Sequence, residues 1–224
     1  MEPNPRPSKS SWLEYSLLAS PFVFLALFWS RFPARVPIHW GMHGIDGWAS
    51  KGFGLLMLPV TNLFIYALIL ATPHLDPKIR RAPDEYERTL GIMRIVRLSV
   101  VVFFIGMFAL QAATALGFPV PVERYAFNGC LILFMIMGNY LSGLRPNYFA
   151  GLRTPWTLEN PETWRATHRL GGRIMFFGAL ILLIAQLFAG MSLWIVFFLI
   201  FIFGFALWTF IYSWNHARTH KQAH

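Results

Sequence analysis

Apolar and polar segments alternate along the whole chain, and the apolar ones are long. A helix needs about 20 predominantly apolar residues to cross the hydrocarbon core of a membrane. Stretches that meet or approach this length occupy residues 12–29, 53–71, 95–116, 126–144, 174–189 and 193–214. Only residues 190–192 separate the short fifth stretch from the sixth, so these two should form a helical hairpin. The pattern predicts an all-α, polytopic integral membrane protein with six transmembrane helices.

Composition agrees with this prediction. Of the 224 residues, 56% are hydrophobic and 13% are charged, and the mean hydropathy is +0.49. These values are typical of an integral membrane protein rather than a soluble domain. No small-residue cleavage site follows the first stretch, so we expect it to remain as an anchor. Cys130 is the single cysteine, which excludes an internal disulfide and a cysteine-based metal site.

The distribution of charge indicates a membrane topology. A net charge of +9 could suggest nucleic acid as a partner, but fifteen of the 19 basic residues fall on one side if the six stretches all cross. That side holds both termini, residues 72–91 with the adjoining Arg94 and Arg97, and the polar insert after the fourth stretch. Positive charge accumulates on the cytoplasmic side of membrane proteins. We therefore expect both termini inside, a multi-pass location in the cytoplasmic (inner) cell membrane, and no direct binding of nucleic acid.

Two membrane halves of three helices each follow from this division. Residues 1–117 form the N-terminal half, whose first outer loop contains Pro37-Ile-His-Trp40. Residues 118–224 form the C-terminal half, which contains an arginine-rich cytoplasmic insert at residues 143–173. We found no repeat of fixed period.

The arginine-rich insert is the part of the chain that membrane crossing does not explain. Asn160-Pro-Glu162 predicts the start of a helix, with Asn160 as N-cap and an acidic side chain in the first turn. That helix would present Trp164 and His168 on one face, with Arg165 and Arg169 on a neighbouring one. Arginine binds phosphate and carboxylate in bidentate fashion. The insert is thus either a structural plug or a site for a ligand or partner, with candidate residues Asn139, Arg145, Asn147, Arg153, Thr154, Trp156, Trp164, His168 and Arg169.

The first outer loop is a second candidate site. Its prolines and glycines exclude a long helix and predict an extended, turning segment. Imidazole and carboxylate side chains suit a transition metal, so His39, His43 and Asp46 are weak metal candidates. The alternative is a loop packed on the membrane surface by its aromatic side chains. We predict no metal, and keep as outer-loop candidates His39, Trp40, His43, Asp46, Trp48 and Lys51.

Catalytic patterns are not evident. None of the ten carboxylates lies near the middle of a predicted span, which disfavours a proton-driven transporter with an acidic relay. We found no serine–histidine–acid, phosphate-loop or paired-carboxylate arrangement, and a catalytic claim would depend on His168 alone. The sequence predicts no enzyme activity and no cofactor.

At these residues the sequence resembles a known family, the SdpI-type membrane immunity proteins of bacteria. The insert, from Asn139-Tyr-Leu-Ser-Gly-Leu-Arg145 to Thr154-Pro-Trp-Thr-Leu158, followed by Trp164-Arg-Ala-Thr-His-Arg169 and Gly172, is similar to the C-terminal half of that family. Val36-Pro-Ile-His-Trp-Gly41, with Gly44, Asp46-Gly47, Ser50-Lys51 and Pro59, resembles the uncharacterised domain that often precedes it.

The resemblance implies a six-helix membrane protein. Founding members protect a cell from an antimicrobial peptide toxin made by its siblings, and they relay the toxin's presence by holding a transcriptional repressor at the membrane. By this analogy, the partners would be membrane lipids, a peptide toxin outside and a cytosolic repressor inside. The alternative hypothesis is a lipid- or small-anion-handling membrane protein, a transporter or an enzyme, that uses the arginine-rich insert.

Overall fold

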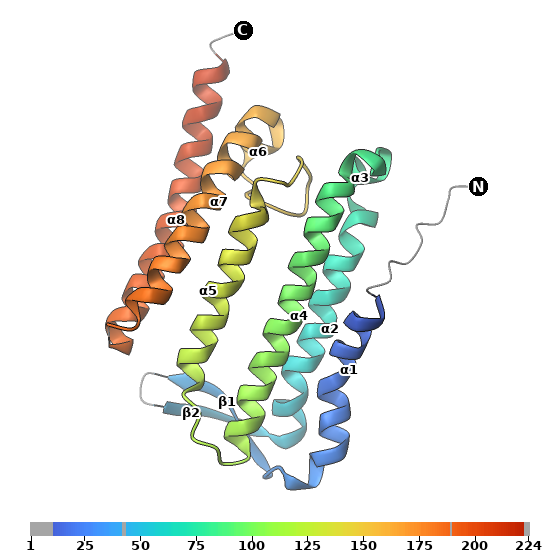
Figure 1. The fold of residues 1–224 in the computed structure, drawn as a ribbon, viewed down its shortest axis with the longest axis vertical. Helices are drawn as coiled ribbons and strands as arrows, with labels where there is room; N and C mark the ends of the chain where they lie inside the picture. The colour runs from blue at the N-terminus through green and yellow to red at the C-terminus, as the bar shows by residue number, and fades with distance from the viewer. Residues whose placement is uncertain (1–10, 42–43, 189, 222–224) are drawn as a thin grey trace, which may run out of the picture. The chain divides into compact units, whose positions relative to one another are not determined.

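The computed structural model describes residues 11–41, 44–188 and 190–221, and most of them are helical (Figure 1). Six long helices lie in these ranges, and each contains most of one predicted stretch. Two short helices and two 3₁₀ turns connect them. The long helices are α1 (Ser11–Phe28), α2 (Lys51–Leu75), α4 (Glu87–Ala115), α5 (Val122–Leu141), α7 (Pro161–Ala185) and α8 (Met191–Lys221); the short elements are η1 (Trp29–Arg31), α3 (Pro77–Arg81), η2 (Pro83–Tyr86) and α6 (Pro155–Glu159).

Five of the long helices are apolar and long enough to cross a membrane within the described residues. The candidate spans are Trp12–Arg31, Lys51–Leu75, Asp84–Ala115, Pro161–Ala185 and Leu193–Thr219. Helix α5 is the sixth long helix and has 20 residues. It is not among these candidate spans, and Arg124, Asn128 and Asn139 interrupt its apolar sequence.

A β-hairpin corrects the all-α prediction. Strands β1 (Arg35–Gly41) and β2 (Gly44–Ser50) pair antiparallel, with Pro37 opposite Trp48. The segment is extended, as predicted, but its two arms also pair with each other. Pairing satisfies backbone groups that an extended loop would otherwise leave open. Val36 of β1 is fully buried, which fixes the hairpin to the helices beside it.

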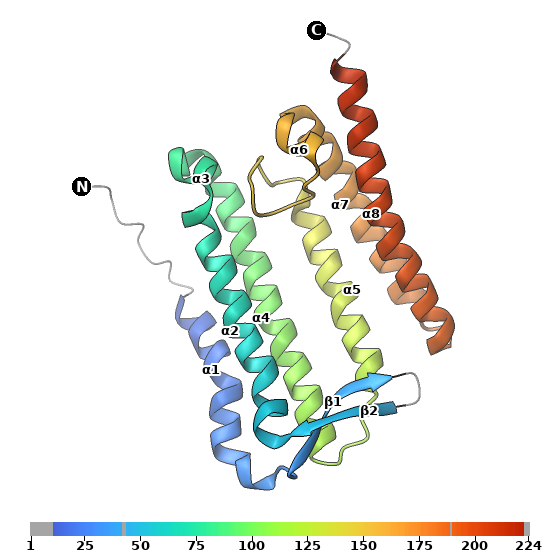
Figure 2. The same cartoon turned by 180° about the vertical axis from the view of Figure 1, so that it is seen from behind.

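The chain folds into two compact units, and the first comprises residues 1–67 and 98–123. It contains α1, the β-hairpin and parts of α2 and α4, with the hairpin at one end of the helices (Figure 2). Its core joins Leu25, Phe32, Val36, Leu55, Phe108 and Ala112. The side-chain amide of buried Gln111 donates to the carbonyls of Pro37 (2.9 Å) and Gly54 (3.1 Å). This one side chain thus connects α4 to both the hairpin and α2.

The second unit comprises residues 68–97 and 124–224. Helices α5, α7 and α8 lie side by side in it, with α6 and the insert at one end (Figure 1). Helices α5 and α7 approach closely at Gly138 and Gly172, where a Cβ on Gly172 would stand 2.6 Å from the Gly138 carbonyl oxygen. Residues 68–97 group with this unit, whereas the predicted halves divide after residue 117. That division remains a prediction about the family's domains.

Candidate functional site

The insert leaves the end of α5 and is folded around the side chain of Asn147, which is fully buried. The amide oxygen of Asn147 accepts from the backbone N–H groups of Phe149 (2.9 Å) and Ala150 (2.7 Å). Its amide nitrogen donates to the carbonyls of Arg145 (2.9 Å) and Ala150 (3.0 Å). All four hydrogen bonds of the amide group are used. Asn147 therefore supplies backbone hydrogen bonds that regular secondary structure would otherwise provide.

Trp164 and His168 close the insert from α7. The two rings stack with centroids 3.9 Å apart, and both side chains are almost completely buried. The indole N–H of Trp164 donates to the carbonyl of Leu144 (2.8 Å). Nε2 of His168 accepts from the backbone N–H of Leu152 (3.0 Å), so Nδ1 carries the proton and donates to the carbonyl of Trp164 (2.8 Å). Both imidazole nitrogens are occupied within the fold.

Gly151 allows this approach. Its φ of +112° lies in the left-handed region that side chains disfavour. A Cβ at this position would overlap the imidazole of His168. The backbone can therefore pass directly over the ring, which places the N–H of Leu152 on Nε2.

Thr154 starts α6 and joins the insert to α8. Its hydroxyl caps the helix by accepting from the N–H of Thr157 (3.3 Å), while the Thr157 hydroxyl accepts from the N–H of Thr154 (2.9 Å). The Thr154 hydroxyl also lies 2.9 Å from that of Ser213, which is fully buried in α8. Trp156 packs edge-on against Phe210 with centroids 4.8 Å apart. Asn160 caps α7 as predicted, accepting from Glu162 and Thr163.

The segment around α3 also holds the insert, a role that the sequence pattern did not indicate. Asp76 is fully buried; one carboxylate oxygen caps α3 at Lys78 (2.8 Å), and the other accepts from the N–H of Tyr148 (2.6 Å). The hydroxyl of Thr89 accepts from the N–H of Arg145 (3.0 Å). The Asp76-Pro77 dipeptide is a helix-start signal that predicts the cap. Nothing in the sequence predicts the second bond, because its partner lies 72 residues away.

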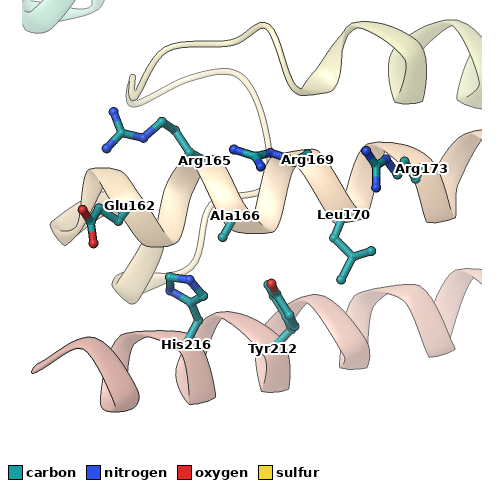
Figure 3. A pocket seen from close by; sticks show the side chains of 8 residues that line it. All are labelled: Glu162, Arg165, Ala166, Arg169, Leu170, Arg173, Tyr212 and His216. Carbon is teal, nitrogen blue, oxygen red and sulfur yellow. The ribbon is translucent and has the colours of Figure 1, made fainter. Parts of the chain in front are cut away.

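The candidate arginines have separate surroundings. Arg145 forms an exposed ion pair with Glu85 (3.0 Å), and Arg153 donates to the carbonyl of Tyr148 (2.7 Å). Arg169 is exposed on α7, in line with Arg165 and Arg173 (Figure 3). Asn139 is exposed on α5, and no described group bonds its side chain. The candidate set therefore divides into a buried network and exposed cations.

A mostly apolar cavity of about 330 Å³ lies beside the insert within the second unit. It is lined by residues of α2, α4, α5, α7 and the insert itself, among them Met93, Leu141, Leu152 and Met175. The polar groups of Asn147 and His168 are engaged in the insert's own bonds. The space therefore suits apolar contacts rather than polar chemistry.

The outer-loop candidates lie on the β-hairpin. Nδ1 of His39 contacts a carboxylate oxygen of Asp46 across the strands, and both side chains are exposed. Trp48 is half-exposed, and Trp40 is partly buried. Lys51 donates to the carbonyl of Trp29 (3.0 Å) at the start of α2.

Metal ligands do not gather in the described part of the chain, where no group of three His, Cys, Asp or Glu side chains could hold an ion. His39 and Asp46 therefore form a pair without a third ligand in that part. His43, the remaining member of the predicted set, lies outside the described residues.

The region of the insert and the region of the β-hairpin are each similar to a known protein family or domain. Residues 143–213, which cover the insert, α6 and much of α7 and α8, match the SdpI/YfhL protein family. Residues 17–63, which cover the β-hairpin and parts of α1 and α2, match a domain of unknown function, DUF1648. The immunity protein SdpI of Bacillus subtilis (strain 168) is 22% identical over 185 residues, covering 81% of this chain and 84% of that protein. No solved structure matches significantly.

These findings define the class of protein as a multi-pass helical membrane protein. Within that class, residues 143–213 are similar to the SdpI/YfhL family and residues 17–63 to DUF1648, so the predicted family resemblance is confirmed.

Proposed function

We propose that this chain is a non-enzymatic immunity protein of the bacterial cytoplasmic membrane, which protects its cell from an antimicrobial peptide. The observation behind this proposal is the similarity to an immunity protein over 81% of the chain. The family region contains the insert, α6, α7 and most of α8, so the similarity extends well beyond a short motif.

The internal bonding of the insert supports a structural or relay role. A general base needs an accessible nitrogen or oxygen near its substrate. His168 uses both ring nitrogens within the fold and is 1% exposed. Catalysis by this residue would require the insert to open first.

The proposed topology has six crossings with both termini in the cytoplasm. Helix α5 supplies the crossing that hydropathy alone does not assign, because its 20 residues at about 1.5 Å each span the hydrocarbon core. The β-hairpin would then face the outside, where His39, Trp40, Asp46 and Trp48 could meet a peptide. The insert would face the cytoplasm, where a repressor could dock.

Helix α4 is the proposed route between these two surfaces. Gln111, near its end, bonds the hairpin strand β1, and Thr89, near its start, accepts from the insert at Arg145. The helix is continuous from Glu87 to Ala115. In this proposal, a peptide that displaces the hairpin would act on the helix whose first turn bonds the insert.

A survival assay tests the immunity proposal. Cells of the source strain with and without this gene are challenged with concentrated culture supernatant from sibling cells that secrete the peptide. We expect the deletion strain to die and the complemented strain to survive. Equal killing of both strains contradicts the proposal. A strain with His39→Ala and Trp48→Ala, with Ser50→Ala as control, tests whether the hairpin meets the peptide.

A further inference from the structure

A polar groove of about 370 Å³ lies between α7 and α8, apart from the bonded core of the insert (Figure 3). Its lining includes Arg165, Arg169 and Arg173 of α7, and Tyr212 and His216 of α8. All five belong to the second unit. The lining of the groove therefore contains three cations, a phenol and an imidazole.

The three arginines form one row along α7 because they are four residues apart (Figure 3). Eight residues at about 1.5 Å each place the first and last roughly 12 Å apart along the helix. All three side chains are exposed, and none forms an ion pair with a carboxylate among the described residues. Unpaired neighbouring cations repel one another, and an anion would relieve that repulsion.

Helix α8 adds fixed polar groups to the lining. Nδ1 of His216 lies 3.1 Å from the hydroxyl of Thr163, which holds the imidazole against α7. Tyr212 stacks on Trp208 with centroids 5.1 Å apart. Glu162 is the one carboxylate in the lining. Three guanidinium groups against one carboxylate leave the groove positive.

The apolar pattern indicates that the row would lie at the depth of lipid headgroups. From residue 174 to residue 217 the chain has no Asp, Glu, Lys or Arg, so Arg173 marks the edge of the apolar part of α7. The headgroup layer extends about 5–8 Å beyond the hydrocarbon core on each side. A row of roughly 12 Å that starts at this edge passes through the whole layer. Tyr212 and Trp214 of α8 are the aromatic residues expected at such an interface.

We propose that this groove binds a phosphate group, either in the headgroup of an anionic phospholipid or as free phosphate. Guanidinium groups form paired, charge-assisted hydrogen bonds with phosphate oxygens. The inference does not depend on immunity, and it assigns the anion-handling hypothesis to particular residues. Arg145 and Arg153 are not part of this site, since both bond within the second unit elsewhere.

Calorimetric titration of the full-length protein in detergent micelles tests the proposal. The probes are a short-chain phosphatidylglycerol, the matching phosphatidylcholine and inorganic phosphate. The test variant is Arg165→Gln with Arg169→Gln. The control variant is Arg80→Gln with Arg81→Gln, which removes two exposed cations from α3. Thermal unfolding of both variants verifies that they fold.

We expect phosphatidylglycerol or inorganic phosphate to bind the test variant at least about tenfold more weakly than wild type. The control variant should stay within about twofold, because distant exposed charges are screened. Binding of phosphatidylglycerol alone identifies the lipid headgroup as the source, and competition by inorganic phosphate identifies the free anion. Equal loss in the two variants, or no loss in the test variant, overturns the proposal.

Discussion

At the scale of residues, the buried polar side chains of the insert form hydrogen bonds that hold its irregular backbone in place. Asn147 bonds four backbone groups of the insert, and His168 bonds the N–H of Leu152 and the carbonyl of Trp164. A buried backbone N–H without a partner costs about 1–3 kcal/mol. These residues therefore determine whether the loop has one conformation. The same bonds explain why polar residues can occur in a stretch without helix or strand.

Replacement of His168 tests this interpretation. His168→Leu removes the acceptor for Leu152 N–H and the ring stacked on Trp164, so we expect destabilisation of about 1–3 kcal/mol. In His168→Gln the amide oxygen is as many bonds from Cβ as Nε2, so it can accept the same hydrogen bond. We expect the Gln variant to unfold at a temperature between wild type and the Leu variant. Thermal unfolding in detergent measures the order.

If the Leu and Gln variants unfold together, the ring stacking rather than the hydrogen bond stabilises the insert. If both match wild type, neither interaction matters for stability, and the proposal that His168 stabilises the insert is wrong.

Residue roles are only partly predictable from the sequence. The N-cap at Asn160 and the shared face of Trp164 and His168 follow from local spacing, and the structure has both. Asp76 is not among the predicted residues, because its bond to Tyr148 joins segments that are far apart in the chain. Local patterns predict caps, whereas long-range hydrogen bonds depend on the finished fold. Whether the candidate residues bind a partner stays a prediction.

At the scale of elements, the packing of α5 against α7 depends on the positions of glycine residues. Helices α5 and α7 meet backbone to backbone at Gly138 and Gly172. Helix α7 continues without interruption through Gly171 and Gly172 to Ala185. Small residues at a crossing let helices approach closely in a membrane. The glycines at this crossing therefore fix the distance at which α5 supports α7.

A glycine exchange tests this crossing. Gly172→Ala would bring a Cβ to 2.6 Å from the Gly138 carbonyl oxygen, so the helices must separate and the unfolding temperature should fall. The control is Gly204→Ala in α8, where an added Cβ meets nothing within 4 Å. Alanine favours helix over glycine by about 1 kcal/mol, so the control should match or exceed wild type. Equal thermal stability of the two variants contradicts the close crossing.

The sequence predicts the helices better than it predicts which segments pair with one another. All six apolar stretches lie largely within the long helices, because hydropathy over about 20 residues is a strong signal. The sequence predicts the β-hairpin only as an extended, turning segment. Its pairing depends on the register of Pro37 with Trp48 and on the burial of Val36, neither of which alternating polarity indicates. Short strands in a membrane loop give little periodic signal.

At the scale of the whole molecule, the asymmetry of positive charge is the argument for topology. Fifteen of the 19 basic residues fall on one side of the six proposed crossings. This count depends on whether α5 crosses the membrane. Without that crossing, the insert and its arginines would lie outside, on the same side as residues 117–121. Helix α5 is not among the five apolar candidate spans, whereas the charge distribution favours a crossing by this helix.

Single-cysteine labelling tests the proposed topology in intact bacterial cells. Cys130 is first replaced by Ala, and single cysteines are then introduced by Ser50→Cys, Phe118→Cys, Arg80→Cys or Glu159→Cys at four exposed positions. A membrane-impermeant maleimide should label the first two directly. The last two should react only after permeabilisation, because the positive-inside rule puts their basic surroundings in the cytoplasm. Phe118 and Glu159 flank α5, so labelling of both from the same side would mean that α5 does not cross. Labelling of Arg80→Cys but not Ser50→Cys in intact cells would invert the orientation, which would place the arginine-rich insert outside and the hairpin beyond the reach of an external peptide.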